Sequence, residues 1–232
     1  MRKKVAVVIP AYDEASVIRE VIAGIKKELR KTKFEFGIIV VNDCSGDNTS
    51  SVSRRARVVV IDHLVNTGVG GATATGLGYT KKGGYDVVAT MDADGQHDPK
   101  DVVKGVRLLL RTRSDLLIGN RLIDTKGMSK TKIIGNRGLS LITRLLFGTN
   151  ISDSQSGLRI FSKRAIKELN WSTGGYEFCS EMIWRAKQAG LVCGEYPIRA
   201  IYTEHSRKKG QSNWNAVNII KSLVRQRLSE IL

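Results

Sequence analysis

The chain has 232 residues and a formal net charge of +16 at pH 7, with 41% hydrophobic and 26% charged residues. This composition predicts a globular protein with a sizeable core and excludes an intrinsically disordered chain. So large a positive charge predicts a substrate or partner that carries phosphate, such as nucleic acid, anionic lipid or a phosphorylated small molecule.

Targeting and cysteine patterns exclude several further classes. No stretch approaches the roughly 18 apolar residues that cross a bilayer. The basic N-terminus is followed by a short apolar run over 5–9, which Pro10 and Asp13 interrupt too early for a signal peptide. The cysteines are odd in number and lack CxxC spacing, which argues against a disulfide framework or a zinc site. We therefore expect a cytoplasmic protein.

Short apolar runs alternate with helical patterns through the first half of the chain. In chain order we expect a strand at 4–9, a helix at 14–29, a strand at 36–41, a short helix after 49, a strand at 57–61, a helix at 71–82, a strand at 86–91, a helix at 102–110 and a strand at 116–118. This alternation predicts an α/β fold with a mostly parallel sheet and helices on both faces. Polar clusters at 10–14, 42–49 and 92–98 follow strands, so they should meet in one crevice at the carboxyl ends.

The second half of the chain is less regular. There we expect an amphipathic helix at 131–147, a strand at 158–161, helices at 165–169 and 178–189, an extended segment at 191–202 and a final helix at 216–231. No internal repeat or low-complexity linker divides the sequence. We predict one domain over 1–212, with halves at about 1–120 and 121–212, and an appended C-terminal amphipathic helix at 213–232.

The sequence Asp92-Ala93-Asp94 follows the apolar strand predicted at 86–91. Residues two apart on a strand face the same way, so both carboxylates can approach one cation. Hard oxygen ligands select Mg²⁺ or Mn²⁺, and a cation held by two side chains keeps open positions that suit a diphosphate. A solvated acidic loop is the alternative, but Gln96 and His97 beside the pair favour a metal site. We expect His97 itself to be structural, because Mg²⁺ seldom recruits imidazole.

The glycine-rich stretch 68–76 partly matches the dinucleotide-binding pattern G-x-G-x-x-G. No apolar strand runs directly into it, because Asn66-Thr67 intervenes. We prefer a helix start whose small residues allow close approach of the sheet or of a ligand.

Two basic segments, 126–152 and 207–232, alternate bases with apolar residues. Each pattern fits equally a helix lying in the head-group region of a membrane and a helix packed on the domain.

These motifs occur together in an order that resembles family 2 glycosyltransferases of GT-A fold. The first half supplies VIPAYDE at 8–14, VNDCSGDNT at 41–49, NTGVGGA at 66–72 and DADGQH at 92–97. The second half supplies GNR at 119–121, SDSQSGLR at 152–159, YEF at 176–178 and EYPI at 195–198. This second set resembles the dolichyl-phosphate mannose synthase branch and its polyprenyl-phosphate glucosyl relatives.

The resemblance implies roles for particular residues. The nucleotide-sugar site would contain Pro10, Tyr12, Glu14, Asp43, Gly71, Ala72, Asp92, Ala93, Asp94 and Arg207. The metal, Mg²⁺ or Mn²⁺, would be held by Asp92, Asp94 and Gln96. The acceptor phosphate would be held by Gln96, Arg121, Arg137 and Ser140. The residues nearest the reaction would be Asp94, Arg121 and Asp153. Residues 1–120 then form the nucleotide-sugar half and 121–212 the acceptor half.

The activity implied is an inverting, metal-dependent transfer of a hexose from GDP-mannose, UDP-glucose or UDP-GlcNAc to a polyprenyl (dolichyl) phosphate, for protein or cell-surface glycosylation. We expect the enzyme to be peripheral at the cytoplasmic face of the cell membrane or of the ER. A phosphate acceptor, with its second pKa of about 6, needs no general base. The alternative is a hydroxyl acceptor with Asp153 as base. A remote alternative is a nucleic-acid-binding protein, although aromatic residues are only 6% of the chain.

The sequence departs from the family pattern at two places. Asn42 and Cys44 stand where the family usually has an aspartate and a glycine. Later, Ser212-Asn213 stands where the family often has Ser-Lys, so Lys208 or Lys209 would have to supply a donor-phosphate cation. Both departures concern the donor rather than the type of reaction.

Overall fold

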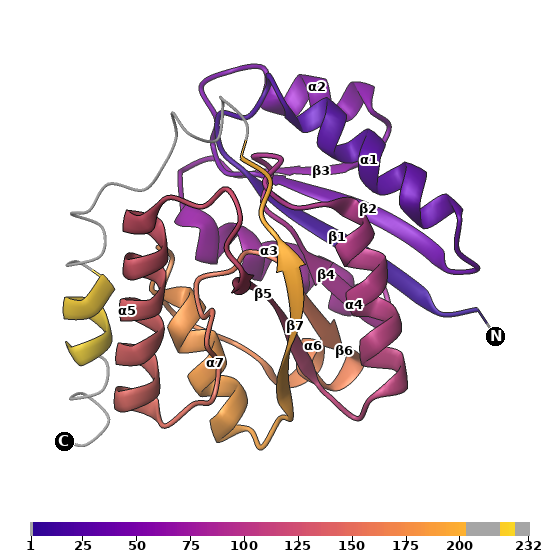
Figure 1. Ribbon diagram of the computed structural model, residues 1–232. Helices are drawn as coiled ribbons and strands as arrows, with labels where there is room; N and C mark the ends of the chain where they lie inside the picture. The colour runs from indigo at the N-terminus through magenta and orange to yellow at the C-terminus, as the bar shows by residue number, and fades with distance from the viewer. Residues whose placement is uncertain (1, 203–218, 226–232) are drawn as a thin grey trace.

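The computed structural model describes residues 2–202 and 219–225. Its strands are β1 (Lys4–Ala11), β2 (Glu35–Asn42), β3 (Val59–Asp62), β4 (Val87–Thr90), β5 (Leu116–Asp124), β6 (Arg159–Ser162) and β7 (Cys193–Arg199). They form one sheet in the order β3-β2-β1-β4-β6-β5-β7 (Figure 1). Only β6 runs antiparallel to its neighbours, β4 and β5. The predicted mostly parallel α/β fold is confirmed.

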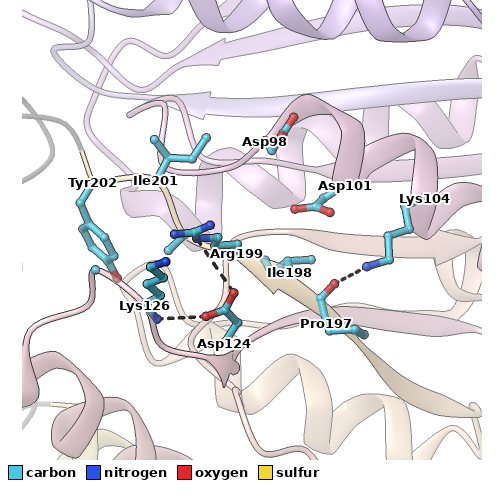
Figure 2. A pocket seen from close by; sticks show the side chains of 12 residues that line it. Asp98, Asp101, Lys104, Asp124, Lys126, Pro197, Ile198, Arg199, Ile201 and Tyr202 are labelled. Atoms are coloured by element: carbon cyan, nitrogen blue, oxygen red, sulfur yellow. Dashed lines mark hydrogen bonds and ion pairs between the residues drawn. The ribbon is translucent and has the colours of Figure 1, made fainter.

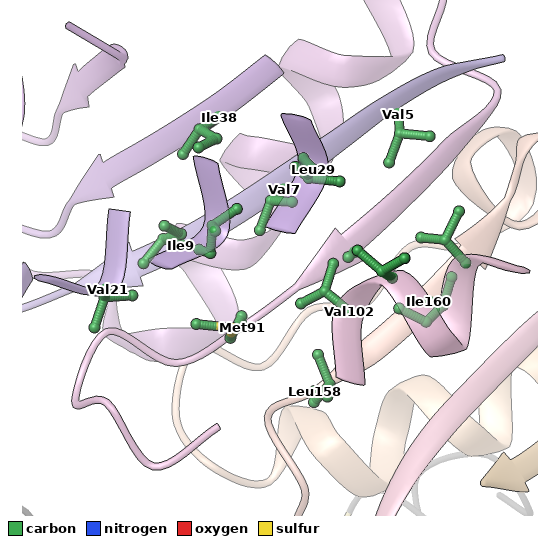
Figure 3. Packing of buried hydrophobic residues seen from close by; sticks show 14 of the residues in the cluster. Val5, Val7, Ile9, Val21, Leu29, Ile38, Met91, Val102, Leu158 and Ile160 are labelled. Carbon is green, nitrogen blue, oxygen red and sulfur yellow. The ribbon is translucent and has the colours of Figure 1, made fainter. Parts of the chain in front are cut away.

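Helices cover both faces of this sheet. In the described residues they are α1 (Ile18–Arg30), α2 (Thr49–Arg55), α3 (Gly68–Lys82), α4 (Pro99–Arg111), α5 (Lys130–Phe147), α6 (Lys163–Glu168) and α7 (Phe178–Gln188). Successive side chains of a strand point to opposite faces, so the sheet separates two apolar clusters. Val5, Val7 and Ile9 of β1 pack toward α1 and α4 (Figure 3). Ala6 and Val8 pack toward α3, α6 and α7.

A third apolar cluster joins α5 to the C-terminal part of the chain. Residues 219–225 are helical, which agrees with the helix predicted there. Ile219 and Leu223 pack with Leu139 and Phe147 of α5 and with Trp184 of α7. This helical segment lies alongside α5 at the edge of the molecule (Figure 1).

Among the element boundaries that differ from the prediction, two have reasons that the hydrogen bonds identify. Helix α1 begins at Ile18 rather than at residue 14, because the carbonyl of Glu14 accepts hydrogen bonds from the amides of Val17 and Ile18 in a preceding turn. Strand β5 continues to Asp124 beyond the predicted Ile118, because pairing with β7 extends past the apolar residues. The predicted division at residue 120 falls inside β5, so the two predicted halves share one sheet.

Alanine substitutions at two glycines of α3 distinguish the effect of packing on stability from the effect of helix propensity. A Cβ on Gly76 would lie 2.2 Å from Cγ1 of Val8, whereas a Cβ on Gly78 would meet nothing within 4 Å. We expect Gly76→Ala to lower the free energy of unfolding by about 1–3 kcal/mol through overpacking. We expect Gly78→Ala to raise it by about 0.5–1 kcal/mol. Urea denaturation followed by circular dichroism measures both, and equal effects would contradict the close approach of α3 to β1.

Candidate functional site

The loops after β1 and β2 are joined by hydrogen bonds at the carboxyl edge of the sheet. The amide of Asp13 donates to Ser45 Oγ at 2.9 Å, and the amide of Gly46 donates back to Asp13 Oδ1 at 2.8 Å. The amide of Glu14 donates to Thr49 Oγ1 at 2.8 Å. These bonds fix the segment that carries the predicted nucleotide-pocket residues Pro10, Tyr12 and Glu14. Tyr12 is exposed, whereas Pro10 and Glu14 are buried.

Asp43, predicted to lie near the donor base, is buried, and its side chain contacts residues of the neighbouring loop. Its Oδ1 accepts hydrogen bonds from the amide and hydroxyl of Thr67 at 2.9 and 2.8 Å, and lies 2.8 Å from His63 Nδ1. The carboxylate therefore fixes the turn that leads into α3. At the preceding position, the amide group of Asn42 donates to Asp62 Oδ1 at 2.9 Å, a contact that an aspartate at 42 would replace with repulsion.

The glycine-rich start of α3 lies against a loop from the second half of the chain. The amide of Gly70 donates to the carbonyl of Gly174 at 2.6 Å, and a Cβ on Gly70 would lie 2.4 Å from the carbonyl oxygen of Thr173. Ala72 is fully buried among the core residues, and Gly71 is half-buried. The preferred interpretation of this stretch, a helix start that allows close approach, fits these contacts.

The acidic cluster lies in the loop directly after β4. The backbone amide of Gln96 donates a hydrogen bond to Asp94 Oδ1 at 2.9 Å, and the side-chain amide of Gln96 donates one to Asp94 Oδ2. Nε2 of the buried His97 lies 3.5 Å from Asp92 Oδ2. This contact with the first of the two predicted metal ligands agrees with a structural role for His97.

Opposing electrostatic effects act on the two carboxylates. Burial disfavours ionisation of Asp92, but the hydrogen bond and charge of His97, together with Arg159 and Arg121, outweigh it and hold the pKa of Asp92 below its usual value. Burial and the negative charge of Asp92 raise the pKa of Asp94. The two carboxylates are therefore close enough to repel each other.

The residues present fit the predicted divalent cation. Two repelling carboxylates and an amide are hard oxygen donors of the kind that Mg²⁺ and Mn²⁺ prefer, and a cation relieves their repulsion. Within residues 2–202 and 219–225, no group of three or more histidine, cysteine or acidic side chains is placed to hold a metal. A cation held by Asp92 and Asp94 would keep open positions for a substrate, because two side chains do not complete its coordination.

Gly157 is a site residue that the sequence prediction did not assign. A Cβ at this position would lie 1.9 Å from Asp92 Oδ2, so the backbone of Gly157 packs directly against that carboxylate. The Gly157 carbonyl accepts a hydrogen bond from Thr90 at the end of β4 at 3.0 Å. The glycine stands in the motif SQSGLR, but its contact with Asp92 comes from another part of the chain, which the sequence pattern does not reveal.

A buried ion pair lies beside the acidic cluster. Nε and Nη2 of Arg121, on β5, each donate to a different oxygen of Asp153 at 2.8 Å, and the Arg121 amide donates to Oδ2 at 2.9 Å. Asp153 is 0% exposed. Burial opposes the charge of Arg121, but Asp153 outweighs it and raises the pKa of Arg121. Both oxygens of Asp153 are thus engaged.

The loop that carries Asp153 is held in turn by Glu195 of β7. Glu195 Oε1 accepts hydrogen bonds from the amides of Ser152 and Asp153 at 3.0 Å, and from the side chain of Asn120 at 3.1 Å. The other oxygen, Oε2, accepts from the Ser152 hydroxyl at 2.6 Å. Three segments far apart in sequence are joined in this way around Arg121.

The remaining predicted acceptor residues lie on α5. Ser140 is buried, and its hydroxyl accepts a hydrogen bond from the amide of Ser154 at 3.0 Å, which ties α5 to the loop of Asp153. Arg137 is exposed on the same helix. Arg207 lies outside the described residues.

A cavity of about 650 Å³ opens beside this site, between α4, the end of β5 and the segment after β7 (Figure 2). Asp124 lies in its wall, where it accepts from the Lys126 amide at 3.1 Å and lies 4.0 Å from Arg199 Nε. Neither Asp92 nor Asp94 lines this cavity, so it adjoins the acidic cluster rather than containing it.

Residues 6–170 match the sequence model of glycosyl transferase family 2. The chain belongs to this family. An uncharacterised protein of Methanocaldococcus jannaschii is 40% identical over 98% of this chain and 93% of its own. A protein of Methanococcus voltae named UDP-N-acetylglucosamine–dolichyl-phosphate N-acetylglucosaminyltransferase is 36% identical over 99% of this chain and 98% of its own. The family 2 resemblance to the polyprenyl-phosphate branch is confirmed, as is the prediction of a glycosyltransferase.

A solved structure supports the GT-A architecture. Glucosyl-3-phosphoglycerate synthase from Mycobacterium tuberculosis, in complex with Mn²⁺, UDP and glucosyl-3-phosphoglycerate, superposes with a TM-score of 0.74 at 18% identity. The match covers 98% of this chain and 79% of that one. With the fold and the family established, the remote alternative of a nucleic-acid-binding protein is set aside.

Gly157→Ala tests how closely the loop 152–157 approaches the acidic cluster. The added methyl group would displace the Asp92 carboxylate, so we expect kcat/KM for sugar-nucleotide turnover to fall by about 100-fold, since misplaced reacting groups are costly. Gly78→Ala, where a Cβ meets nothing within 4 Å, is the matched control and should retain activity. Steady-state kinetics measures both, and full activity of Gly157→Ala would contradict the packing.

Proposed function

We propose that this family 2 glycosyltransferase transfers a sugar from a nucleoside diphosphate to a polyprenyl phosphate with inversion at the anomeric carbon. The observation that carries the proposal is the engagement of both Asp153 oxygens by Arg121. A carboxylate that is fully buried and bound to an arginine is a poor general base. A hydroxyl acceptor needs such a base, whereas a phosphate acceptor is already ionised at pH 7.

In the proposed reaction a phosphate oxygen of the acceptor attacks the anomeric carbon while the bond from that carbon to the diphosphate breaks. Asp92, Asp94 and Gln96 would hold Mg²⁺ or Mn²⁺, which neutralises charge on the departing diphosphate. His97 and Gly157 fix the Asp92 carboxylate for this task. Arg121, oriented by Asp153, would contact the acceptor phosphate as a charge-assisted donor.

For the donor we propose UDP-N-acetylglucosamine. The support is the Methanococcus voltae relative, whose name specifies this donor and whose chain matches this one over nearly its whole length. UDP-glucose and GDP-mannose are the competing donors.

The experiment measures transfer by the purified protein from each of the three donors, with Mn²⁺ or Mg²⁺, to a short-chain polyprenyl phosphate or to the polyprenol of the same length. We expect sugar-lipid product from UDP-N-acetylglucosamine and only with the phosphate. Asp94→Ala should lower kcat by at least about 100-fold, because it removes a carboxylate that stabilises the metal.

Transfer to the polyprenol instead would support the alternative in which Asp153 acts as a base. Transfer that is unchanged by chelation with EDTA would contradict the metal site, and preference for GDP-mannose would replace the proposed donor. No transfer to either acceptor with any donor would contradict the function as a whole.

We also propose that this enzyme lies on a membrane surface through the outer face of α5, defined by Ile134, Leu141 and Leu145. These side chains are 71%, 53% and 76% exposed and recur at helical spacing. Arg137 and Arg144 on the same helix are exposed, and they would meet anionic head groups. In the part of the chain that the structure describes, no helix is long and apolar enough to span a bilayer.

Co-sedimentation with vesicles of phosphatidylcholine and phosphatidylglycerol tests this contact. We expect the double variant Leu141→Glu, Leu145→Glu to bind about 10-fold or more weakly, because two apolar side chains leave the lipid boundary. Leu110→Glu, at an exposed position on α4, is the control and should bind like the unaltered protein. Equal binding of all three would contradict the proposal.

A further inference from the structure

Helix α5 carries a lysine on the side opposite its outer face. Lys132, Leu139 and Thr143 recur at intervals of seven and four residues, so they share one side of the helix. Leu139 and Thr143 are buried, and Lys132 is half-buried. The outer face starts two positions later with the same spacing, and two residues of an α-helix turn through about 200°. Lys132 therefore faces the body of the protein.

The ammonium group of Lys132 lies over the aromatic ring of Tyr202, with Nζ 5.1 Å from the ring centroid. Tyr202 follows β7 on a segment tied to the acidic loop. The amide of Ile201 donates to the carbonyl of Gln96 at 2.8 Å, and Ala200 forms an antiparallel bridge with His97. Figure 2 shows Tyr202 next to Ile201 on this segment. The contact thus links α5 to the loop that carries the predicted metal ligands.

Tyr202 also lies among the charged groups of the candidate site. Burial raises the pKa of its phenol, Arg121 opposes this, and Asp153 and Asp94 add to it. The phenol is therefore neutral at pH 7 and keeps a hydroxyl that donates. The phenol of Tyr202 therefore interacts electrostatically with both the buried ion pair and the acidic cluster.

The charges near Arg121 indicate that an acceptor phosphate bound there would need a second cation beside Arg121. A phosphate monoester carries about −1.5 to −2 charges at pH 7. The charge of Arg121 is already compensated by Asp153. Among the described residues, no carboxylate lies within 4.0 Å of Lys132, and its partner there is the ring of Tyr202. Within residues 2–202 and 219–225, the positive charge of Lys132 is therefore not compensated by a carboxylate, and an anion could compensate it.

We propose that Lys132 contacts the acceptor phosphate and that Tyr202 positions its ammonium group for this contact. The proposal rests on the proposed function. Within that function, Lys132 is a residue that determines the specificity for the acceptor. Arg137, which the family resemblance implies for this role, is exposed on the same helix. Lys132 then distinguishes a phosphate from a neutral hydroxyl acceptor, because only the phosphate compensates its charge.

The test compares four variants of α5 in steady-state transfer to a short-chain polyprenyl phosphate, with purified protein in the absence of vesicles. We expect Lys132→Met to raise KM for the acceptor by about 10- to 100-fold, the effect of losing one hydrogen bond between charged groups. KM for the sugar nucleotide should stay within about twofold, since only the acceptor contact is removed. Lys132→Arg should restore most of the acceptor affinity. Lys130→Met, which removes a neighbouring charge of the same helix, should leave KM for the acceptor unchanged. Arg137→Met tests the alternative that the resemblance implies, in which Arg137 is the cation that holds the phosphate.

Tyr202 is tested in the same assay as a positioning residue. Tyr202→Leu removes the ring face and should raise KM for the acceptor, whereas Tyr202→Phe keeps that face and should change it less. In the Lys132→Met background, Tyr202→Leu should add little, because the two side chains act on one contact.

Three results would overturn the inference. The first is an acceptor KM for Lys132→Met that equals that of Lys130→Met. The second is a rise confined to Arg137→Met. The third is an equal rise in KM for donor and acceptor, which indicates a general structural role of Lys132. Failure of the unaltered protein to transfer to polyprenyl phosphate would overturn the proposed function together with this inference, so the two failures are distinguishable.

Discussion

The buried ion pair between Arg121 and Asp153 is the interaction on which the rest of the site depends. Removing either partner would leave a charge uncompensated in the interior, at a cost of about 3–5 kcal/mol. The pair joins β5 to the loop 152–157, and Glu195 of β7 holds the same loop by its amides. That loop in turn places Gly157 against Asp92. The geometry of the acidic cluster is thus set by a contact between distant parts of the chain.

Charge is distributed unevenly in this strongly basic protein. Of the negative groups of the site, Asp153 is paired with a cation, whereas Asp92 and Asp94 are crowded together. Crowded carboxylates favour a divalent cation, and a phosphate-bearing acceptor favours the arginine and lysine around them. The same division accounts for a net charge of +16 in an enzyme whose proposed substrates are both anions.

Much of the fold could be predicted from the sequence, because most strands and helices have their own apolar period. The turn before α1 and the extension of β5 could not. At Glu14 a backbone turn interrupts a helical pattern, and at Asn120 pairing with β7 extends a strand through polar residues. In the first place a local backbone turn delays the start of a helix, and in the second place pairing with a strand far along the chain moves the end of a strand.

The sequence by itself determined the order of the polar clusters, and parallel strands bring such clusters to one edge of the sheet. It also determined the family, because that order is specific. The tertiary structure decided which of those groups remain available. It engaged both oxygens of Asp153, set Gly157 against Asp92, and turned Lys132 inward while Arg137 stays exposed. Such contacts join residues far apart in the chain, and their geometry follows only from how the sheet, the loops and α5 pack together.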